Sequence, residues 1–248
     1  MIAFGRTDKG IVRKDNQDQF KIEELEDDRL LVAVVCDGMG GAKAGNVASG
    51  LAAETFVKAL SEQPGALLDD ELASDALKDA LMAANRVIYE TAKEQKDYKG
   101  MGTTLVGAAL RKKDGNWKAD IINVGDSRAY HISDGKLIQI TKDHSLVEDM
   151  VTRGDITRDE ALHHPNRNLI TRVVGTMPEV ICDFFEVALK EGDRLLFCSD
   201  GLTNLVSDEE LFEEILHQSD LEKCCEMLIT LALAKGGSDN VTVLLIGI

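Results

Sequence analysis

The stretch LLVAVVCDGMGG, residues 30–41, joins an apolar run to an aspartate and a cluster of glycines. Six apolar residues followed by a cysteine are typical of a buried strand, and we predict one over Leu30–Cys36. A strand that ends on Asp37 with flexible backbone behind it has two chemical interpretations. The glycines could cradle the phosphates of a nucleotide, or the carboxylate could belong to a metal site at the rim of a sheet.

The nucleotide interpretation fails on motif spacing. A P-loop reads G-x-x-x-x-G-K-[ST]; here Gly40 and Gly45 have the required gap, but asparagine and valine follow them. A dinucleotide fingerprint needs a third glycine where Lys43 stands. Neither motif is present, and the carboxylate interpretation remains.

Asp18 and Asp37 are predicted to lie at one edge of a sheet. Asp18, in RKDNQDQF, precedes a strand predicted over Gln19–Leu25, and only the polar turn EDDR separates that strand from the next. A hairpin brings the start of its first strand beside the end of its second. Both carboxylates therefore lie on the same rim.

The second half of the chain repeats this arrangement. RLLFCSDGL carries the predicted strand Arg194–Cys198 toward Asp200, and GGSDNVTVLLIGI opens another strand with Asp239. If these two strands are antiparallel neighbours, their aspartates also share a rim. INVGDSRAYHI places Asp126 in a tight turn between two strands. Five aspartates thus stand at strand boundaries that are compatible with a single edge.

A cluster of carboxylates points to a hard divalent cation. Carboxylates without partners repel one another unless a cation supplies the opposing charge. Oxygen ligands without histidine or cysteine suit Mg²⁺ or Mn²⁺ rather than zinc or copper. A pair of such ions can lower the pKa of a water and present hydroxide to a phosphoryl group. Gly38 has no Cβ to keep its carbonyl from an ion, and Arg13, near Asp18, can hold phosphate in its planar fork.

The rest of the pattern predicts an α+β fold. Apolar residues recur at helical spacing in residues 42–60 and 72–92, and further helices are predicted over Asp208–His217 and Leu221–Lys235. Many strands with helices gathered in pairs indicate antiparallel sheets covered by helices. The other predicted strands, which are short, β-branched and bounded by turn residues, are Thr103–Leu110, Ala119–Val124, Arg128–Ile132, Val180–Val187 and Val241–Ile246.

Composition limits the class of protein. The 248 residues allow one large domain or two small ones, and the formal net charge of -16 argues against nucleic acid or an anionic membrane as partner. No apolar run is long enough for a membrane span, and the first residues, MIAFGRTDKG, do not resemble an export signal. Five cysteines in no metal-like spacing suit reduced core thiols. We expect a cytoplasmic monomer without disulfides.

The segment His144–Gly175 differs in composition from its surroundings. It contains the polar and basic run HHPNRN and shows little strand periodicity, which predicts a long excursion over the surface. Such excursions are often functional lids, and the alternative is an ordinary surface elaboration.

The chain contains, in this order, the segments GIVRKDNQDQF, VVCDGMGGAKAGNVAS, GMGTTLVGAAL, INVGDSRAYHI, ITKDHSLV, RNLITRVVGT, LLFCSDGLTNLVSDEEL and GGSDNVTVLLI. Together these eight segments resemble the metal-dependent PPM-type (type 2C) serine/threonine protein phosphatases, and specifically their compact bacterial members. The resemblance covers essentially the whole chain. It implies one domain over residues 1–248, built as a four-layer αββα sandwich, with a flap at about 144–175 that bears on substrate choice.

The resemblance also implies roles for individual residues. Two core Mn²⁺ or Mg²⁺ ions would take side-chain ligands from Asp37, Asp200 and Asp239, and a backbone-carbonyl ligand from Gly38. Asp18 would contact the centre mainly through metal-bound water. These positions coincide with the carboxylates that the strand pattern had already placed at one rim.

Two further positions match the edge of such a site, and two others differ from the pattern of the family. Asp126 would serve a third, weaker ion, and Arg13 would bind phosphate. Some relatives carry a histidine, the proposed general acid in eukaryotic members, where Met39 or Ala42 stands here. The proton donor to the leaving group is therefore open. Metal-bound water near Asp126 is the donor that we expect, and the alternatives are His144, His163 and His164.

We expect an enzyme that removes phosphate from phosphoserine and phosphothreonine on proteins by attack of a metal-bridging hydroxide. The resemblance implies that it opposes a bacterial eukaryotic-type serine/threonine kinase. One rival is a regulatory binding protein that keeps the fold and has lost catalysis, but such a protein has no physical need to hold repelling carboxylates together. Another is a phosphatase dedicated to one phosphoserine regulator of transcription.

Overall fold

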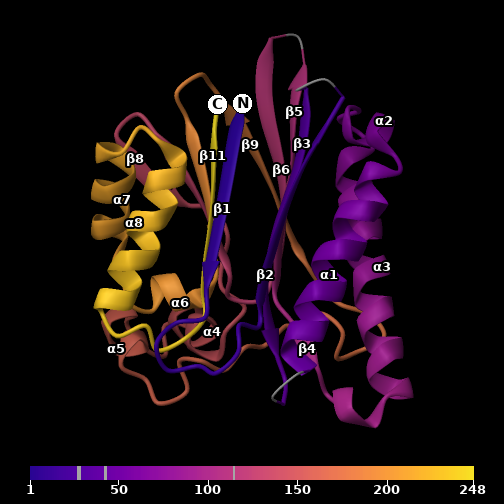
Figure 1. Ribbon diagram of the computed structural model, residues 1–248, viewed down its shortest axis with the longest axis vertical. Coiled ribbons are helices and arrows are strands. Elements are labelled where there is room, and N and C mark those ends of the chain that lie inside the picture. Colours follow the sequence, from indigo (N-terminus) through magenta and orange to yellow (C-terminus); the bar gives the residue numbers. More distant parts are fainter. Residues whose placement is uncertain (27–28, 42–43, 114) are drawn as a thin grey trace.

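The computed structural model describes residues 1–26, 29–41, 44–113 and 115–248, and it contains two antiparallel sheets that face each other (Figure 1). The first sheet has the order β1 (Ile2–Asp8), β11 (Val241–Gly247), β10 (Arg194–Cys198), β7 (Arg128–Ser133) and β8 (Lys136–Gln139). The second has the order β2 (Asp18–Leu25), β3 (Leu30–Met39), β5 (Leu105–Lys113), β6 (Asn116–Val124) and β9 (Asp183–Leu189), and β4 (Gly102–Thr103) pairs with β3.

Helices cover the outer face of each sheet, so the described chain has the expected layers. Helices α1 (Ala44–Ser61) and α3 (Ala73–Glu94) pack on the second sheet, and α7 (Asp208–His217) and α8 (Leu221–Ala234) lie on the first (Figure 1). The shorter helices are α2 (Pro64–Leu67), η1 (Lys96–Tyr98), α4 (Leu146–Arg153), α5 (Arg158–Leu162) and α6 (Asp200–Thr203). The predicted α+β sandwich is confirmed.

Strand β3 lies between the helices on one side and the other sheet on the other, which explains its unbroken apolar run. Side chains alternate between the two faces of a strand. Val32, Val34 and Cys36 belong to the core beneath α1 and α3, whereas Leu31 and Val35 belong to the core between the sheets. All residues of Leu30–Cys36 are fully buried, and burying one large aliphatic side chain contributes about 1.5–3 kcal/mol. The apolar run decides the fold because both of its faces are covered.

The helix boundaries near the C-terminus follow capping signals. Ser207 accepts a hydrogen bond from the backbone of Glu210, whose carboxylate accepts one from the Ser207 backbone, so a capping box begins α7. Asp220 accepts hydrogen bonds from two backbone N–H groups at the start of α8. Both helices begin at the predicted residues, because these side chains satisfy N–H groups that the first helical turn leaves unpaired.

Some predicted boundaries are corrected. Strand β3 runs on to Met39 because β4 pairs with Gly38 and Met39, so the strand does not end at Cys36. The predicted strand Thr103–Leu110 is divided between β4 and β5. Strands β1 and β8, which the pattern did not indicate, form the two edges of the first sheet. The His144–Gly175 segment, predicted as a long surface excursion with little strand periodicity, contains the short helices α4 and α5.

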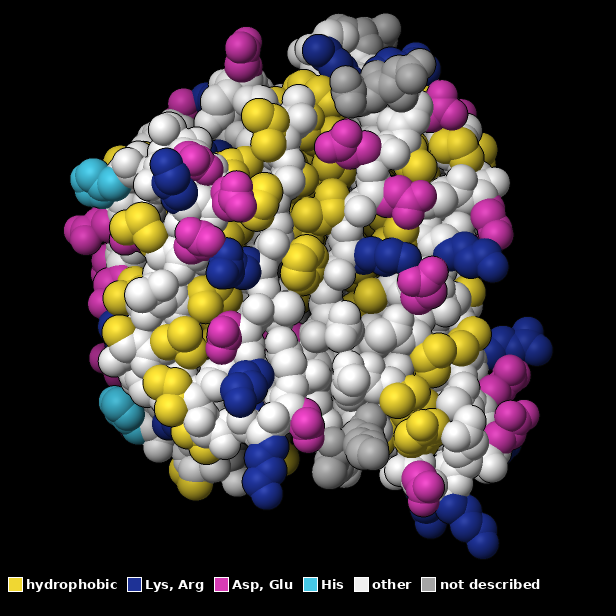
Figure 2. All heavy atoms as spheres, in the orientation of Figure 1, with side chains coloured by type: hydrophobic (Ala, Val, Ile, Leu, Met, Phe, Trp, Pro, Cys, Tyr) yellow, Lys and Arg dark blue, Asp and Glu magenta, His cyan; other side chains and the backbone are white. Residues whose placement is uncertain are grey.

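Acidic and basic side chains are interspersed on the face shown in Figure 2, and hydrophobic side chains appear along the seam between the two sheets. Among the described residues, no helix is long and apolar enough to cross a membrane. The two chain ends lie together at one end of the sandwich, and the segments that lead to β2 and α6 lie at the other (Figure 1). The predicted carboxylates belong to this second end.

Candidate metal centre

Asp18 and Asp37 are paired across the β2–β3 hairpin. Their Cα atoms are partners in the antiparallel register, as the hairpin predicted. The Asp37 backbone is fixed by the next strand along: its N–H donates to Thr104 Oγ1 at 2.9 Å, and its carbonyl accepts from Thr104 N and from Thr103 Oγ1. The carboxylate of Asp37 is thus presented by backbone that is hydrogen-bonded to neighbouring strands on both sides.

Asp200 and Asp239 lie at neighbouring strand ends in the first sheet. Strands β10 and β11 are antiparallel partners, which confirms the pairing on which the sequence argument depended. Asp200 follows β10 as the first residue of α6, and its Oδ2 accepts a hydrogen bond from Asn204 Nδ2 at 2.9 Å. Asp239 precedes β11, and its Oδ1 accepts from the backbone N–H of Asn240 at 2.8 Å.

Asp18 also joins the two sheets. Its Oδ2 accepts hydrogen bonds from Ser199 Oγ and Thr242 Oγ1, each at 2.7 Å, and these two residues belong to the strand ends of the first sheet. The side chain is almost completely buried. The carboxylates of both sheets therefore face one seam, and Ser199 and Thr242 are site residues that the sequence argument missed. Their only local signal is a hydroxyl next to an aspartate or inside a buried strand.

Asp126 occupies the turn between β6 and β7. Gly125 adopts a φ of +109°, and a Cβ at this position would collide with Thr104, so the turn requires glycine. Thr104 Oγ1 and Ser127 Oγ lie 2.7 Å apart and tie the turn to the residue that also holds Asp37. The structure thus brings Asp126 to the same end of the sandwich as the other four aspartates.

Burial and mutual repulsion disfavour the charged form of these side chains. Burial, together with repulsion from Asp200 and Asp239, raises the pKa of Asp18 to about 7 against the hydrogen bonds from Thr242 and Ser199. Burial raises the pKa of Asp126 to about 8, with repulsion from Asp200. The pKa values of Asp37 and Asp200 are raised for the same two reasons. Without a cation between them, the ionised carboxylates of this cluster repel one another.

The donor set fits a hard divalent cation. Asp18, Asp126 and Asp200 each have a buried Oδ1 atom without a hydrogen-bond partner. A buried unpaired carboxylate oxygen is costly, and oxygen donors suit Mn²⁺ or Mg²⁺. Among the described residues, no three metal-binding side chains surround one point as they stand. Instead, the carboxyl groups of Asp37 and Asp200 interact with each other, and Arg13 covers Asp239.

Gly38 is required by close backbone packing. A Cβ on Gly38 would collide with the carbonyl oxygen of Gly45 in the first turn of α1, and a Cβ on Gly45 would press against the Gly38 carbonyl. The Gly38 N–H donates to the Gln17 carbonyl at 3.1 Å. The Gly38 carbonyl is thus held at the start of α1, next to the paired carboxylates.

Arg13 reaches the centre from the loop between β1 and β2. Its Nη2 donates to Asp239 Oδ2 at 2.7 Å, and this contact is the main cause of its raised pKa. Asp37 and Asp200 also stabilise its charge. More than half of the side chain is exposed, so one face of the guanidinium remains open to a ligand at the rim.

The histidines differ in their relation to the centre. His144 Nδ1 accepts a hydrogen bond from Gly125 N at 3.1 Å, and its Nε2 lies 3.0 Å from Arg172 Nη1 and 3.3 Å from Asp183 Oδ2, so both ring nitrogens are occupied. Burial lowers its pKa. His163 and His164 lie at the end of α5, where His164 Nδ1 accepts from Asn166 N. Met39 is partly buried at the end of β3, and Ala42 lies outside the described residues.

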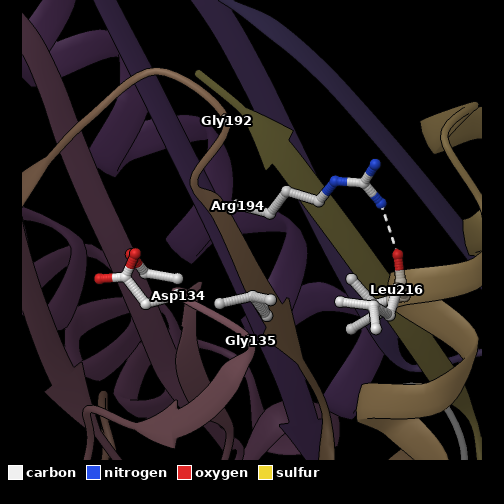
Figure 3. Close-up of a pocket in the computed structure, with 8 residues that line it drawn as sticks. Asp134, Gly135, Gly192, Arg194 and Leu216 are labelled. Carbon is white, nitrogen blue, oxygen red and sulfur yellow. Dashed lines mark hydrogen bonds between the residues drawn. The ribbon is translucent and has the colours of Figure 1, made fainter.

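The cavity drawn in Figure 3 lies away from this centre. A cavity of about 160 Å³ is lined by the β7–β8 turn, the segment before β10 and the end of α7 (Figure 3). Arg194 points toward α7 and donates to the carbonyls of Ile215 and Gln218, both at 2.6 Å. Arg194 is the first residue of β10, whereas Asp200 comes two residues after its last, Cys198. The carboxylate cluster is therefore an open rim at the opposite end of the strand.

Comparison with known proteins agrees with this geometry. The family model described as Protein phosphatase 2C matches residues 11–227. The chain is 38% identical to the serine/threonine phosphatase stp of Listeria welshimeri over 246 residues, which are 99% of this chain and 95% of that protein.

Solved structures show the same likeness. The serine/threonine phosphatase Stp1 from Staphylococcus aureus superposes with a TM-score of 0.89 at 40% identity, covering 99% of this chain and 94% of that one. The catalytic domain of the serine threonine protein phosphatase PstP, in complex with two manganese ions, gives 0.81 at 37% identity, covering 98% and 96%. The chain belongs to the protein phosphatase 2C family.

Proposed function

We propose that this protein removes phosphate from phosphoserine and phosphothreonine in other proteins at the rim formed by its five aspartates. As a family member it is a phosphoprotein phosphatase that uses Mn²⁺ or Mg²⁺. The observation that carries the assignment to this rim is the set of buried, unpaired carboxylate oxygens on Asp18, Asp126 and Asp200, drawn from both sheets.

The residues nearest the seam are proposed to hold two core ions. Asp37, Asp200 and Asp239 would supply carboxylate oxygens and Gly38 its carbonyl, because these groups are gathered where β3, β10 and β11 reach the rim. When bound, such ions neutralise phosphate charge and activate a water. Asp18, hydrogen-bonded to both neighbouring hydroxyls, would hold the seam together and orient solvent at the edge of the centre.

Arg13 and Asp126 are proposed to act beside the core. Arg13 would turn its planar fork from Asp239 to the phosphate oxygens of the substrate and hold them in line. Asp126 would hold a third ion, and the proton for the leaving serine or threonine oxygen would come from that side of the rim. Occupation of both His144 ring nitrogens argues against His144 as the donor.

Wider assignments follow from this role. We propose that the chain is a single catalytic domain with residues 144–175 as its flap, since one core is shared by both sheets. We propose further that it acts as a monomer in the cytoplasm, where its five free cysteines would stay reduced, and that it opposes a serine/threonine kinase.

The test is hydrolysis of a phosphothreonine peptide with Mn²⁺, with and without a chelator. The parent is expected to lose activity on chelation, and Asp239→Asn to lose at least about 100-fold in kcat at saturating Mn²⁺. Asp134→Asn is a matched control, because Asp134 is exposed in the β7–β8 turn and Asn tolerates its positive φ. A parent that is active after chelation, or inactive at every Mn²⁺ concentration, would contradict the proposal.

A further inference from the structure

The loop that carries Arg13 is fastened by one buried amide. Residues 9–17 join β1 to β2 without regular secondary structure. Asn240 Nδ2 donates to the carbonyls of Lys9 at 2.8 Å and Asp15 at 3.0 Å, and its Oδ1 accepts from the backbone N–H of Gln17 at 2.8 Å. A single side chain therefore binds the beginning and the end of the loop, with Arg13 between them.

The loop also packs against the backbone that leads to Asn240. Ile11 N donates to the Gly237 carbonyl at 2.8 Å, and a Cβ on Gly10, whose φ is +77°, would collide with the carbonyl of Asp239. Asp239 itself accepts the Arg13 guanidinium. Consecutive residues thus bind the side chain of Arg13 and the backbone on either side of it.

From these contacts we infer that Asn240 is the positioning residue for Arg13. Asn240 is 5% exposed, and both of its N–H donors and its carbonyl oxygen are engaged by the backbone of this loop, so the side chain has no donor left for a substrate. The Arg13 side chain makes one ion pair and is largely exposed, so its place depends on its backbone. The inference rests on the proposed phosphate-binding role of Arg13 and extends it to a residue that touches neither phosphate nor metal.

Asn85 provides a matched control. It is also fully buried, donates from Nδ2 to two carbonyls, those of Met177 and Pro178, and accepts from the backbone N–H of Gly175. The same number and kind of hydrogen bonds are lost on substitution, but the segment that it fastens does not carry Arg13. Asn240→Ser and Asn85→Ser keep a small polar side chain, and the two alanine variants provide a second pair. If Asn240→Ala does not fold, the serine pair decides.

The kinetic test is a double-mutant cycle with Arg13→Ala on a small aryl phosphate at saturating Mn²⁺. Asn240→Ser is expected to lower kcat/KM by at least about tenfold in the parent, since a 1 Å misplacement can cost about 100-fold. In the Arg13→Ala background the loss should fall below about threefold, because the group being positioned is gone. The inhibition constant of inorganic phosphate should rise in parallel. Asn85→Ser should lower kcat/KM by the same factor in both backgrounds.

A second readout needs no activity. In metal-free protein, amide hydrogen exchange in residues 9–17 should be at least about tenfold faster in Asn240→Ser and unchanged in Asn85→Ser. Equal kinetic losses in both backgrounds, or unchanged exchange in the loop, would overturn the inference and leave the proposed function intact. If the parent hydrolyses no phosphopeptide, or Arg13→Ala is as active as the parent, the proposed role of the site fails, whereas the exchange result still decides whether Asn240 fastens the loop.

Discussion

Asp18 and Asp37 are direct partners across two antiparallel strands, and both carboxyl groups face a seam that also contains Asp200 and Asp239. Like charges opposite each other destabilise a sheet, so this pair is retained at a cost in stability. A divalent cation between the sheets would convert that repulsion into attraction. The stability of the protein should therefore depend jointly on pH and on metal.

Asp18→Asn tests this coupling in metal-free protein. The folded-state pKa of Asp18 lies near 7, above its unfolded value, so the folded protein binds more protons between about pH 4 and pH 7 and loses stability as pH rises through that window. The substitution should raise the melting temperature at pH 8 and leave it nearly unchanged at pH 4. About 1 kcal/mol corresponds to about 2–4 °C for a chain of this size. An equal shift at both pH values would contradict the prediction.

Arg13→Ala should have opposite effects on metal binding and on catalysis. The ion pair with Asp239 competes with a cation for the same carboxylate, and exposed ion pairs contribute about 0.2–1 kcal/mol. Calorimetric titration should therefore show Mn²⁺ affinity raised by up to about fivefold. The value of kcat/KM should fall by about 100-fold, since the phosphate loses its bidentate partner. Arg13→Lys keeps the charge without the fork and should recover only a small part of the activity. Weakened Mn²⁺ binding in Arg13→Ala would refute the competition.

Gly38→Ala should damage the centre through the backbone alone. Its Cβ would collide with the Gly45 carbonyl, which is backbone and cannot move aside without displacing α1. We expect a loss of at least about 2 kcal/mol in the free energy of unfolding, with weaker Mn²⁺ binding. Gly50 lies in α1 with open space around it, so Gly50→Ala should instead stabilise the protein by about 0.5–1 kcal/mol. Urea unfolding measures both, and equal behaviour of the two variants would refute the packing argument.

His144→Asn separates a structural from a catalytic role. An asparagine oxygen can replace Nδ1 as the acceptor for the Gly125 N–H, so the turn that carries Asp126 should survive with a loss of about 1 kcal/mol. If His144 has no role in proton transfer, both limbs of the pH–kcat profile should keep their positions. Loss of the alkaline limb in the variant would identify His144 as the general acid after all.

The hairpin and the helices could be predicted because their signals are local, whereas the pairing of β10 with β11 entered the sequence argument only as a condition. Leu30–Cys36 is a continuous apolar run, and capping residues mark the starts of α7 and α8. Strand β1 was missed because its side chains are mostly half-exposed and include charged residues, as at an edge strand. Strand β8, at the other edge, has only four residues. The extension of β3 to Met39 depends on β4, which comes more than sixty residues later.

The residues that support the site could not be predicted, because their contacts join positions far apart in the chain. Ser199 and Thr242 bind Asp18 across separations of 181 and 224 residues, and Asn240 binds Lys9 across 231. Nothing in the chain near Asp18 indicates which hydroxyls will face it. The aspartates themselves could be identified because a carboxylate at the end of an apolar strand is unusual in its own neighbourhood. Their assignment as metal ligands stays a prediction.

The hydrogen bonds from Ser199 and Thr242 to Asp18 have a mechanical consequence. They connect the two sheets at the end where both carry negative charge, so they act against an electrostatic force that pushes the sheets apart. Loss of metal should open the sandwich from this end while the end that holds the chain termini stays closed. The separation of the two sheets at this end would then depend on the supply of divalent cations in the surroundings of the protein.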